Sequence, residues 1–338
     1  MGLLQGEQVQ RYDCSACAAE EVQEHGIEAT WICVLAYSVL HYWPYHQACG
    51  FDSVSITTPH SWFLEPGNRG VAAARNRIID EASGDYLYFM DSDDVIAENT
   101  IELMMQHVRQ FDAEIVFGSY EKIEITGERV VYQYPAIQLF GEDELASFAY
   151  RKYAGIQASA CNYLVKTSLL REHHHRFIDT NYWEDLVFTF DLVTMIKRAV
   201  LLPDITYFYL CREDSLSNYQ QRNQISKDEI MKNVHAIEHL KHTSSILYNK
   251  VYFPNRCFNI LMTDFYIACH ILKRKNDIVP SFSNREIKEI LSYPATFRQI
   301  CHFRQLRCKN LTLFLLSKLP SSLCVAALWM IEKAKKLL

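Results

Sequence analysis

The chain has 338 residues, of which 49% are hydrophobic and 22% are charged, and its formal net charge is -6. This is the composition of an ordinary globular protein, long enough for one large domain or two smaller ones. An acidic chain lacks the basic surface that general nucleic-acid binding needs, so nucleic acid is not expected as a partner.

The cysteines and the N-terminus predict a cytoplasmic protein. Eleven cysteines are an odd number, and they show no framework spacing, so mostly reduced thiols are expected. The N-terminus lacks the basic start and apolar core of a secretory signal. The longest apolar stretch near it, residues 29–43, is shorter than the ~20 residues of a membrane-spanning helix, which favours a buried element.

Regular elements begin after an atypical N-terminal region, residues 1–64, in which no strand and helix alternation is visible. The stretch "VAAARNRIIDEAS", residues 71–83, predicts a helix because its apolar residues recur at steps of three and four, and Gly84 follows as a stop signal. The aromatic-rich "DYLYFM", residues 85–90, predicts a short strand. The acidic "DSDD" follows it as a loop.

The same rhythm continues along the chain. Residues 97–111 predict a second helix, with Ile101, Met104, Met105 and Val108 on one face, and residues 113–125 predict a second strand. Helix, strand, loop, helix and strand is the order of an α/β sheet, in which ligands gather outside the carboxyl ends of the strands. The carboxylates of "DSDD" are expected at such an end.

The later elements are less regular. "NYWEDLVFTFDLVTMIKRAVLLP", residues 181–203, predicts a helix that begins near Glu184 and ends before Pro203. "ITYFYLCREDSLSNY" then predicts a strand and a polar loop. Beyond residue 221 the sequence is mainly helical.

The acidic loop has two interpretations. Asp91, Asp93 and Asp94 are typical of a solvated turn whose last acid caps the next helix, and this capping role is the one expected for Asp94. Alternatively, the carboxylates hold Mg²⁺ or Mn²⁺, which prefer oxygen ligands and keep waters and phosphates in their shell. Arg75, early in the preceding helix, suits phosphate oxygens, although a surface salt bridge to Asp80 or Glu81 is its plain alternative.

The block "NRGVAAARNRIIDEASGDYLYFMDSDDVIAENTIELM" resembles the central block of glycosyltransferase family 2, which has the GT-A fold. It carries an Asn-x-Gly turn, an Ala-Arg-Asn helix start, an Ala-x-Gly-x-Tyr strand lead and an Asp-Ser-Asp-Asp loop, in order and at fitting spacing. "YWEDLVFTFDLV" resembles the family's later Glu-Asp motif, and "YFYLCREDSLSN" resembles its Tyr-x-Tyr segment. The resemblance covers residues 65–220 and implies a GT-A catalytic domain there, followed by a helical region over residues 221–338.

The resemblance implies roles for single residues. Asp91 and Asp93 match the DxD motif, with Asp93 as the main metal ligand and Asp91 near the nucleotide or the metal shell. Asp185 matches the catalytic base, which accepts the proton of the acceptor hydroxyl. Four further residues match positions that line the donor or acceptor pocket: Asn68, Arg75, Glu184 and Arg212. A divalent cation would neutralise the leaving nucleoside diphosphate.

The implied reaction is inverting, metal-dependent transfer of a sugar from a nucleotide-diphosphate sugar, with a uridine diphosphate sugar as the expected donor. A glycan or a lipid-linked molecule in surface polysaccharide synthesis is the expected acceptor. The first strands of the family are not recognisable in residues 1–64, so an inactive or truncated transferase remnant is the alternative. Charge at a helix N-terminus is the alternative for Glu184 and Asp185.

The C-terminal stretch "NLTLFLLSKLPSSLCVAALWMIEKAKKLL" predicts two short helices, separated at Pro320, that are too short to span a bilayer. Basic residues surround it, which is typical of an interfacial amphipathic segment. Residues 311–338 are therefore a candidate for peripheral contact with the inner face of the cell membrane. A helix packed on the catalytic domain, or a dimer contact, is the alternative.

Overall fold

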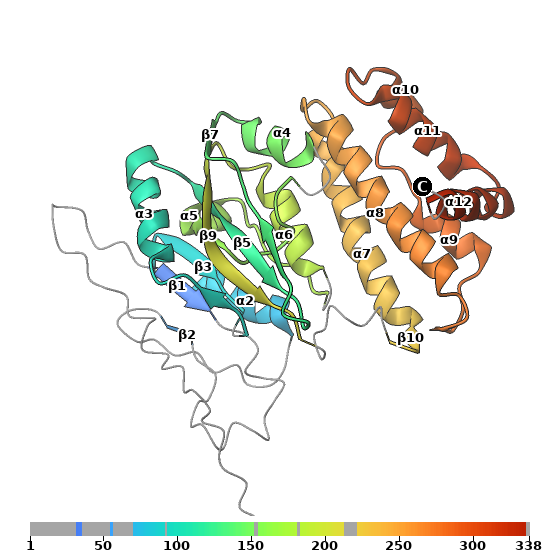
Figure 1. Cartoon of the computed structure of the whole chain (residues 1–338). Coiled ribbons are helices and arrows are strands. Elements are labelled where there is room, and N and C mark those ends of the chain that lie inside the picture. Colours follow the sequence, from blue (N-terminus) through green and yellow to red (C-terminus); the bar gives the residue numbers. More distant parts are fainter. Residues whose placement is uncertain are drawn as a thin grey trace, which may run out of the picture.

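The computed structural model describes residues 70–91, 93–151, 155–180, 183–212 and 222–335, together with two short strands nearer the N-terminus. Figure 1 shows two parts: a sheet with helices around it, and a group of helices beside it that contains the C-terminus. The predicted α/β class with a helical C-terminal region is confirmed.

One nine-stranded sheet forms the first part. Its strands are β1 (Ile32–Leu35), β2 (Ser55–Ile56), β3 (Tyr86–Phe89), β4 (Val95–Ile96), β5 (Ile115–Ile123), β6 (Arg129–Tyr132), β7 (Ile137–Phe140), β8 (Tyr163–Lys166) and β9 (Arg198–Leu210). The main path runs β2-β1-β3-β8-β5-β9-β4, while β6 pairs with β5 and β7 pairs with β9. Parallel pairing joins β1 to β3 and β5 to β9; the other pairs are antiparallel.

The described residues of the first part also form α2 (Val71–Glu81), α3 (Thr100–Phe111), α4 (Glu144–Arg151), α5 (Thr167–Glu172) and α6 (Glu184–Leu192). The predicted order of helix, strand, loop, helix and strand is confirmed by α2, β3, α3 and β5. The apolar spacing explains the packing, because Ile78 and Ile79 of α2 and Met104 and Val108 of α3 are all buried.

The prediction of a helix reaching Pro203 is wrong. The helix ends at Leu192, and Arg198–Leu210 forms β9 instead. The central run from Ala199 to Leu202 is buried throughout. A strand that lies inside a sheet and is covered on both faces reads as a continuous apolar run, so periodicity does not separate it from a buried helix.

The N-terminal region holds more structure than the sequence predicts. β1 lies inside the apolar stretch 29–43, and Ile32 is in register with Tyr86 of β3. The first strands of the family are not recognisable in the sequence of residues 1–64, and the structure adds the short strands β1 and β2 there. The other residues of 1–64 lie outside the described residues.

The helical part begins after residue 222. Its elements are β10 (Ile225–Ser226), α7 (Lys227–Ser244), the 3₁₀ helix η4 (Ser245–Leu247), α8 (Phe253–Lys273), β11 (Ile278–Val279), α9 (Asn284–Ile290), α10 (Phe297–Cys301), α11 (Arg307–Lys318) and α12 (Ser321–Lys335). Ser226, Ser283 and Thr296 form capping boxes that start α7, α9 and α10. The predicted break at Pro320 separates α11 from α12. Among the described helices, none combines the length and the apolar character that crossing a bilayer requires.

Candidate active site

β3 holds the acidic loop at the carboxyl edge of the sheet. All four of its residues are buried, and it lies between β1 and β8. The chain leaves the sheet after Phe89, and the side chains of Asp91 and Asp93 are 34% and 26% exposed. A rigid, buried strand thus presents two accessible carboxylates at the edge where α/β proteins bind ligands.

Asp94 is buried and ties the loop to β9, so the predicted helix cap is wrong. Its Oδ2 accepts a hydrogen bond of 2.6 Å from the Tyr207 hydroxyl, and its Oδ1 accepts one of 2.9 Å from the Leu210 amide. α3 starts later, and its first residue is preceded by Asn99, whose side chain makes no cap. Burial raises the pKa of Asp94 to about 7.

Arg75 of α2 joins the acidic loop to α6. Its Nη2 lies 2.8 Å from Asp91 Oδ1, and its Nη1 lies 3.1 Å from Glu184 Oε1. The guanidinium is buried, and its Cζ lies 5.4 Å from the centre of the Phe177 ring. Asp80, expected as a surface partner, pairs with Arg176 instead. Arg75 is thus a buried bridge between two carboxylates that lie far apart in the sequence.

The N-terminus of α6 supplies the second pair of acids. Trp183 precedes the helix in the left-handed region, with φ of 61°, and Glu184 and Asp185 form the first turn. The Leu186 amide donates a hydrogen bond of 2.7 Å to Asp185 Oδ1. Backbone N–H groups at a helix start stabilise negative charge, so this position suits both a structural charge and a reactive carboxylate.

Burial raises the pKa of Glu184, and the neighbouring charge of Asp185 raises it further. Burial likewise raises the pKa of Asp185, while the Arg75 guanidinium opposes this shift. One arginine cannot balance Asp91, Glu184 and Asp185 together, so the cluster favours an added proton or an added cation. A raised pKa on a carboxylate beside a ligand-binding edge is typical of a proton-transfer group.

The remaining predicted residues are placed as follows. Arg212 lies just after β9 and forms an ion pair with Asp93. Asn68 lies outside the described residues. Six of the seven predicted site residues therefore lie in three groups that meet around the acidic loop: the loop itself, Arg75 with the start of α6, and Arg212.

Tyr207 is the residue that sequence reasoning missed. Its hydroxyl donates to Asp94 and accepts a hydrogen bond of 3.3 Å from the Asp91 amide, so it holds both ends of the acidic loop. It lies in the segment that resembles the family's Tyr-x-Tyr pattern. That pattern was the available signal, but it does not say which tyrosine faces the loop.

The acidic loop fits part of a site for a hard cation. Within the described ranges, no three His, Cys, Asp or Glu side chains are arranged to hold a metal ion by themselves. Mg²⁺ is usually bound through one or two carboxylates and completed by water and substrate phosphates. Asp91 and Asp93 supply such a partial set of oxygen ligands.

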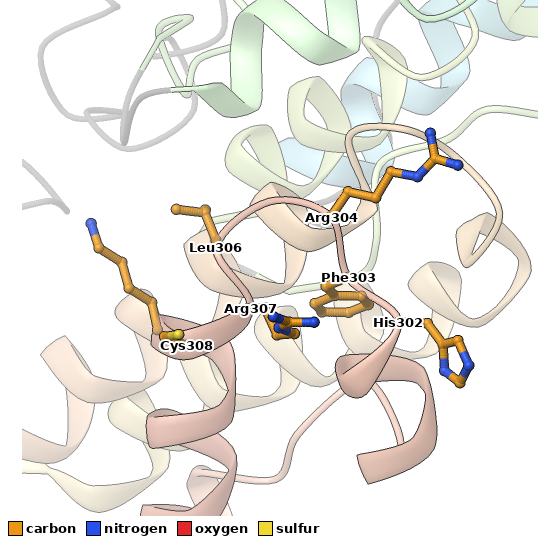
Figure 2. Close-up of a pocket in the computed structure, with 7 residues that line it drawn as sticks. His302, Phe303, Arg304, Leu306, Arg307 and Cys308 are labelled. Atoms are coloured by element: carbon orange, nitrogen blue, oxygen red, sulfur yellow. The ribbon is translucent and has the colours of Figure 1, made fainter.

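A separate, open pocket of about 590 Å³ lies in the helical part, at the connection between α10 and α11. Figure 2 shows His302, Phe303, Arg304 and Arg307 along it. None of the predicted site residues lines this pocket. Its basic lining differs from the acidic character of the sheet edge.

The central segment of the chain matches a known protein family. Residues 62–169 match the family described as "Glycosyl transferase family 2". The resemblance predicted from the sequence motifs is thereby confirmed for this segment, which contains α2, β3 and the acidic loop.

Curated relatives point the same way. The chain is 28% identical over 163 residues to "Glycosyltransferase GlyG" of Streptococcus pneumoniae. The aligned region covers 45% of this chain and 53% of that protein. It is 37% identical over 68 residues to an "Uncharacterized glycosyltransferase" of Haemophilus influenzae, covering 20% of this chain and 27% of that protein. A "Teichoic acid poly(glycerol phosphate) polymerase" of Staphylococcus epidermidis is 26% identical over 147 residues, covering 42% and 19% of the two chains. The matches span about half of these relatives' lengths or less.

Among solved structures, the S. aureus TarS 1-349 fragment in complex with UDP-GlcNAc is similar over 75% of this chain and 72% of its own. The identity is 17% and the TM-score is 0.48.

Proposed function

We propose that this chain, whose central segment matches glycosyl transferase family 2, transfers a sugar from a nucleotide-diphosphate sugar to a glycan or lipid-linked acceptor. The observation that carries the proposal is the bridge made by Arg75. It brings the acidic loop after β3 and the start of α6 into one site, 2.8 Å and 3.1 Å from the two carboxylates. A donor-binding group and a proton acceptor are the two parts that such a transfer needs.

Asp93 and Asp91 would hold a divalent cation, Mn²⁺ or Mg²⁺. When bound, the cation neutralises the negative charge that grows on the leaving diphosphate. Arg212 forms an ion pair with Asp93. A guanidinium beside this carboxylate is also placed to bind the diphosphate oxygens of the donor. A uridine diphosphate sugar is the donor that we propose.

Asp185 would act as the base. Its carboxylate accepts the proton of the acceptor hydroxyl while that oxygen attacks the anomeric carbon, which inverts the configuration there. Burial raises the pKa of Asp185. The reactive carboxylate therefore forms at a higher pH than it does in an exposed aspartate. The turnover rate should therefore rise with pH on the acidic side of its optimum.

Turnover of a panel of nucleotide sugars tests this proposal. We expect release of nucleoside diphosphate that requires Mn²⁺ or Mg²⁺ and is lost with a chelator. Asp93→Ala and Asp185→Ala should each lower the rate by about 100-fold or more. Asp80→Ala is the matched control, because Asp80 lies on the exposed face of α2 with a side chain that is 59% exposed. Metal-independent turnover, or site variants equal to the wild type, would contradict the proposal, and no turnover with any donor would support the inactive alternative.

We also propose peripheral membrane contact through α11 and α12. Leu323, Trp329 and Met330 are exposed on α12. Leu323 and Met330 are seven residues apart and therefore lie on one helix face, with Trp329 beside them. Residues 290–338 carry eight Lys and Arg but a single acid, a net charge of +7, whereas the preceding residues carry 26 Lys and Arg and 39 acids, a net charge of -13. An apolar face in a basic segment suits anionic lipid.

Flotation with vesicles of phosphatidylglycerol and phosphatidylcholine tests this contact. The wild type should float in low salt, and a Trp329→Ser, Met330→Ser variant should stay at the bottom. Ile246→Ser is the matched control, because Ile246 is the most exposed large apolar residue among the described residues outside α12, at 82%. Equal flotation of the Trp329→Ser, Met330→Ser variant and the Ile246→Ser control would contradict the proposed membrane contact.

A further inference from the structure

We infer that Arg256 of α8 is a positioning residue that holds α6, and therefore Asp185, from the helical part of the molecule. This inference rests on the proposed role of Asp185 as the base. The first observation is that the side chain of Arg256 is fully buried, at 0% exposure. A guanidinium so far from water is retained only when its donors are satisfied.

The donors of Arg256 meet four side-chain partners on three helices. Nη2 lies 2.5 Å from Asp191 Oδ1 and 3.0 Å from Thr243 Oγ1. Nη1 lies 2.7 Å from the Tyr150 hydroxyl, and Nε lies 2.8 Å from Ser244 Oγ. Asp191 belongs to α6 and Tyr150 to α4, while Thr243 and Ser244 belong to α7. One side chain thus fastens two helices of the sheet part to two of the helical part.

Arg256 and Tyr150 also cap the C-terminal end of α6. The last carbonyls of a helix have no partner within the helix. The Phe190 carbonyl accepts hydrogen bonds from the Tyr150 hydroxyl and from Arg256 Nη1, and the Arg256 Cζ lies 4.8 Å from the centre of the Phe190 ring. Positive charge at this end also complements the helix dipole.

α6 lies between two hydrophobic cores. Phe188 and Leu192 belong to the core of the sheet part. Val187 belongs to the core of the helical part, and Trp183 packs against it. In Figure 1, α6 accordingly lies between the sheet and α7. The orientation of α6 therefore depends on both parts of the molecule.

Both ends of α6 are held by buried arginines. Arg75 binds Glu184 at the first residue, and Arg256 binds Asp191 near the last. Asp185 and Asp191 are six residues apart, which is a rise of about 9 Å along a helix. A short helix moves as a rigid body, so a change at Asp191 reaches Asp185. A displacement of about 1 Å at a reacting group can lower a rate by 100-fold.

Two variants separate positioning from folding. Arg256→Met combined with Asp191→Leu removes both charges together, and apolar replacement of a buried ion pair often leaves stability unchanged. Tyr150→Phe removes only the hydroxyl that links Arg256 to the Phe190 carbonyl. This smaller change should leave the protein folded, so it serves as the test if the double variant does not fold. Lys250→Met with Asp143→Leu is the control, because it removes a partly exposed pair.

The measurements are kcat, the Kd for uridine diphosphate, and the ¹⁹F spectrum of protein labelled with 5-fluorotryptophan. Trp183 precedes Glu184 directly, so its resonance, assigned with Trp183→Phe, reports the position of the α6 start. We expect the double variant to fold, to keep the wild-type Kd, to shift the Trp183 resonance and to lose 10- to 100-fold in kcat. Tyr150→Phe should show the same changes with smaller size, and the control pair should show none.

A folded Arg256 and Asp191 double variant with an unchanged Trp183 resonance and wild-type kcat would overturn the inference. If only Tyr150→Phe folds, the same unchanged readings from that variant would overturn it. Asp185→Asn separates this result from failure of the proposed function. If Asp185→Asn keeps the wild-type kcat, the assigned base is wrong, whereas the Trp183 resonance still reports whether Arg256 positions α6.

Discussion

Arg75 is the residue on which the candidate site depends most. Glu184 is almost wholly buried, and Arg75 is its ion-pair partner at 3.1 Å. An ion pair of this kind stabilises little relative to apolar residues, but removing one partner leaves the other buried and uncompensated. The same arginine fixes where Asp91 points.

Arg75→Met should lower the free energy of unfolding by about 3–5 kcal/mol, measured by urea denaturation. The loss should be smaller at pH 5 than at pH 8. Without Arg75 the pKa of Glu184 rises further, and the penalty for burying its charge is present only where it is ionised. Arg176→Met is the control, because it removes a partly exposed pair with Asp80 and should cost less than about 1 kcal/mol. Equal losses in the two variants would contradict the buried bridge.

Asp94 should make stability fall as pH rises. Its pKa is about 7 in the folded protein, compared with about 3.9 in an unfolded chain. Between these two values the native state holds a proton that the unfolded state has released. Stability therefore decreases through this window and stays at its lower value above it.

Asp94→Asn should remove this part of the pH dependence. The wild type should lose up to about 1.4 kcal/mol per pH unit more than the variant between pH 4.5 and 6.5, read from urea denaturation at several pH values. Asp80→Asn, at an exposed position, should keep the wild-type slope. A slope that Asp94→Asn leaves unchanged would show that burial does not hold a proton on Asp94.

At the scale of elements, the pairing of β5 with β9 fixes where the site residues emerge. The register shifts around Ser119, where Phe117 pairs with Leu201 but Ser119 pairs with Ile205, and Pro203 lies in the extra residues. A bulge of this kind tolerates proline and bends the strand. After the bulge, β9 brings Tyr207 and the Leu210 amide to Asp94.

Gly118 should be the most sensitive glycine of this pairing. A Cβ built there would lie 1.8 Å from Thr206 Oγ1 and 2.9 Å from Met104 Cε. Gly118→Ala should therefore push Thr206 of β9 and Met104 of α3 away from β5. We expect it to lower the free energy of unfolding by about 1–3 kcal/mol or more. Gly127→Ala is the control: nothing lies within 4 Å of its Cβ, so only its positive φ opposes the change, at about 1 kcal/mol. A Gly118→Ala variant as stable as Gly127→Ala would contradict this packing.

Local pattern predicted the elements whose periodicity is visible, and it failed where tertiary context decides. α2, β3 and α3 follow from apolar spacing and turn residues. The pattern predicts helix for residues 198–202, the start of β9, because a strand covered on both faces shows no alternation, whereas residues 205–210 are correctly predicted as strand. The acidic loop was predicted with its place at the sheet edge. The partners of Arg75 and Asp94 were not predicted, because Glu184 and Tyr207 lie more than 100 residues away in the chain.

At the scale of the molecule, the two larger hydrophobic cores share α6. Most of the first core comes from residues 72–207 and most of the second from residues 225–328. Arg256 joins them by reaching Asp191 and Tyr150 from α8. The helical part is thus fastened to the element that carries Asp185. No sequence pattern predicted this connection, because Arg256 lies within an ordinary amphipathic helix.

The most direct test of the central claim is the metal dependence of nucleotide binding at Asp93. Calorimetric titration with uridine diphosphate would compare the wild type, Asp93→Asn and Asp80→Asn, each with Mn²⁺ and with a chelator. We predict that Mn²⁺ tightens binding by at least about 10-fold, or 1.4 kcal/mol, in the wild type and in Asp80→Asn but not in Asp93→Asn. An affinity that Mn²⁺ leaves unchanged, or that Asp93→Asn retains in full, would contradict the account.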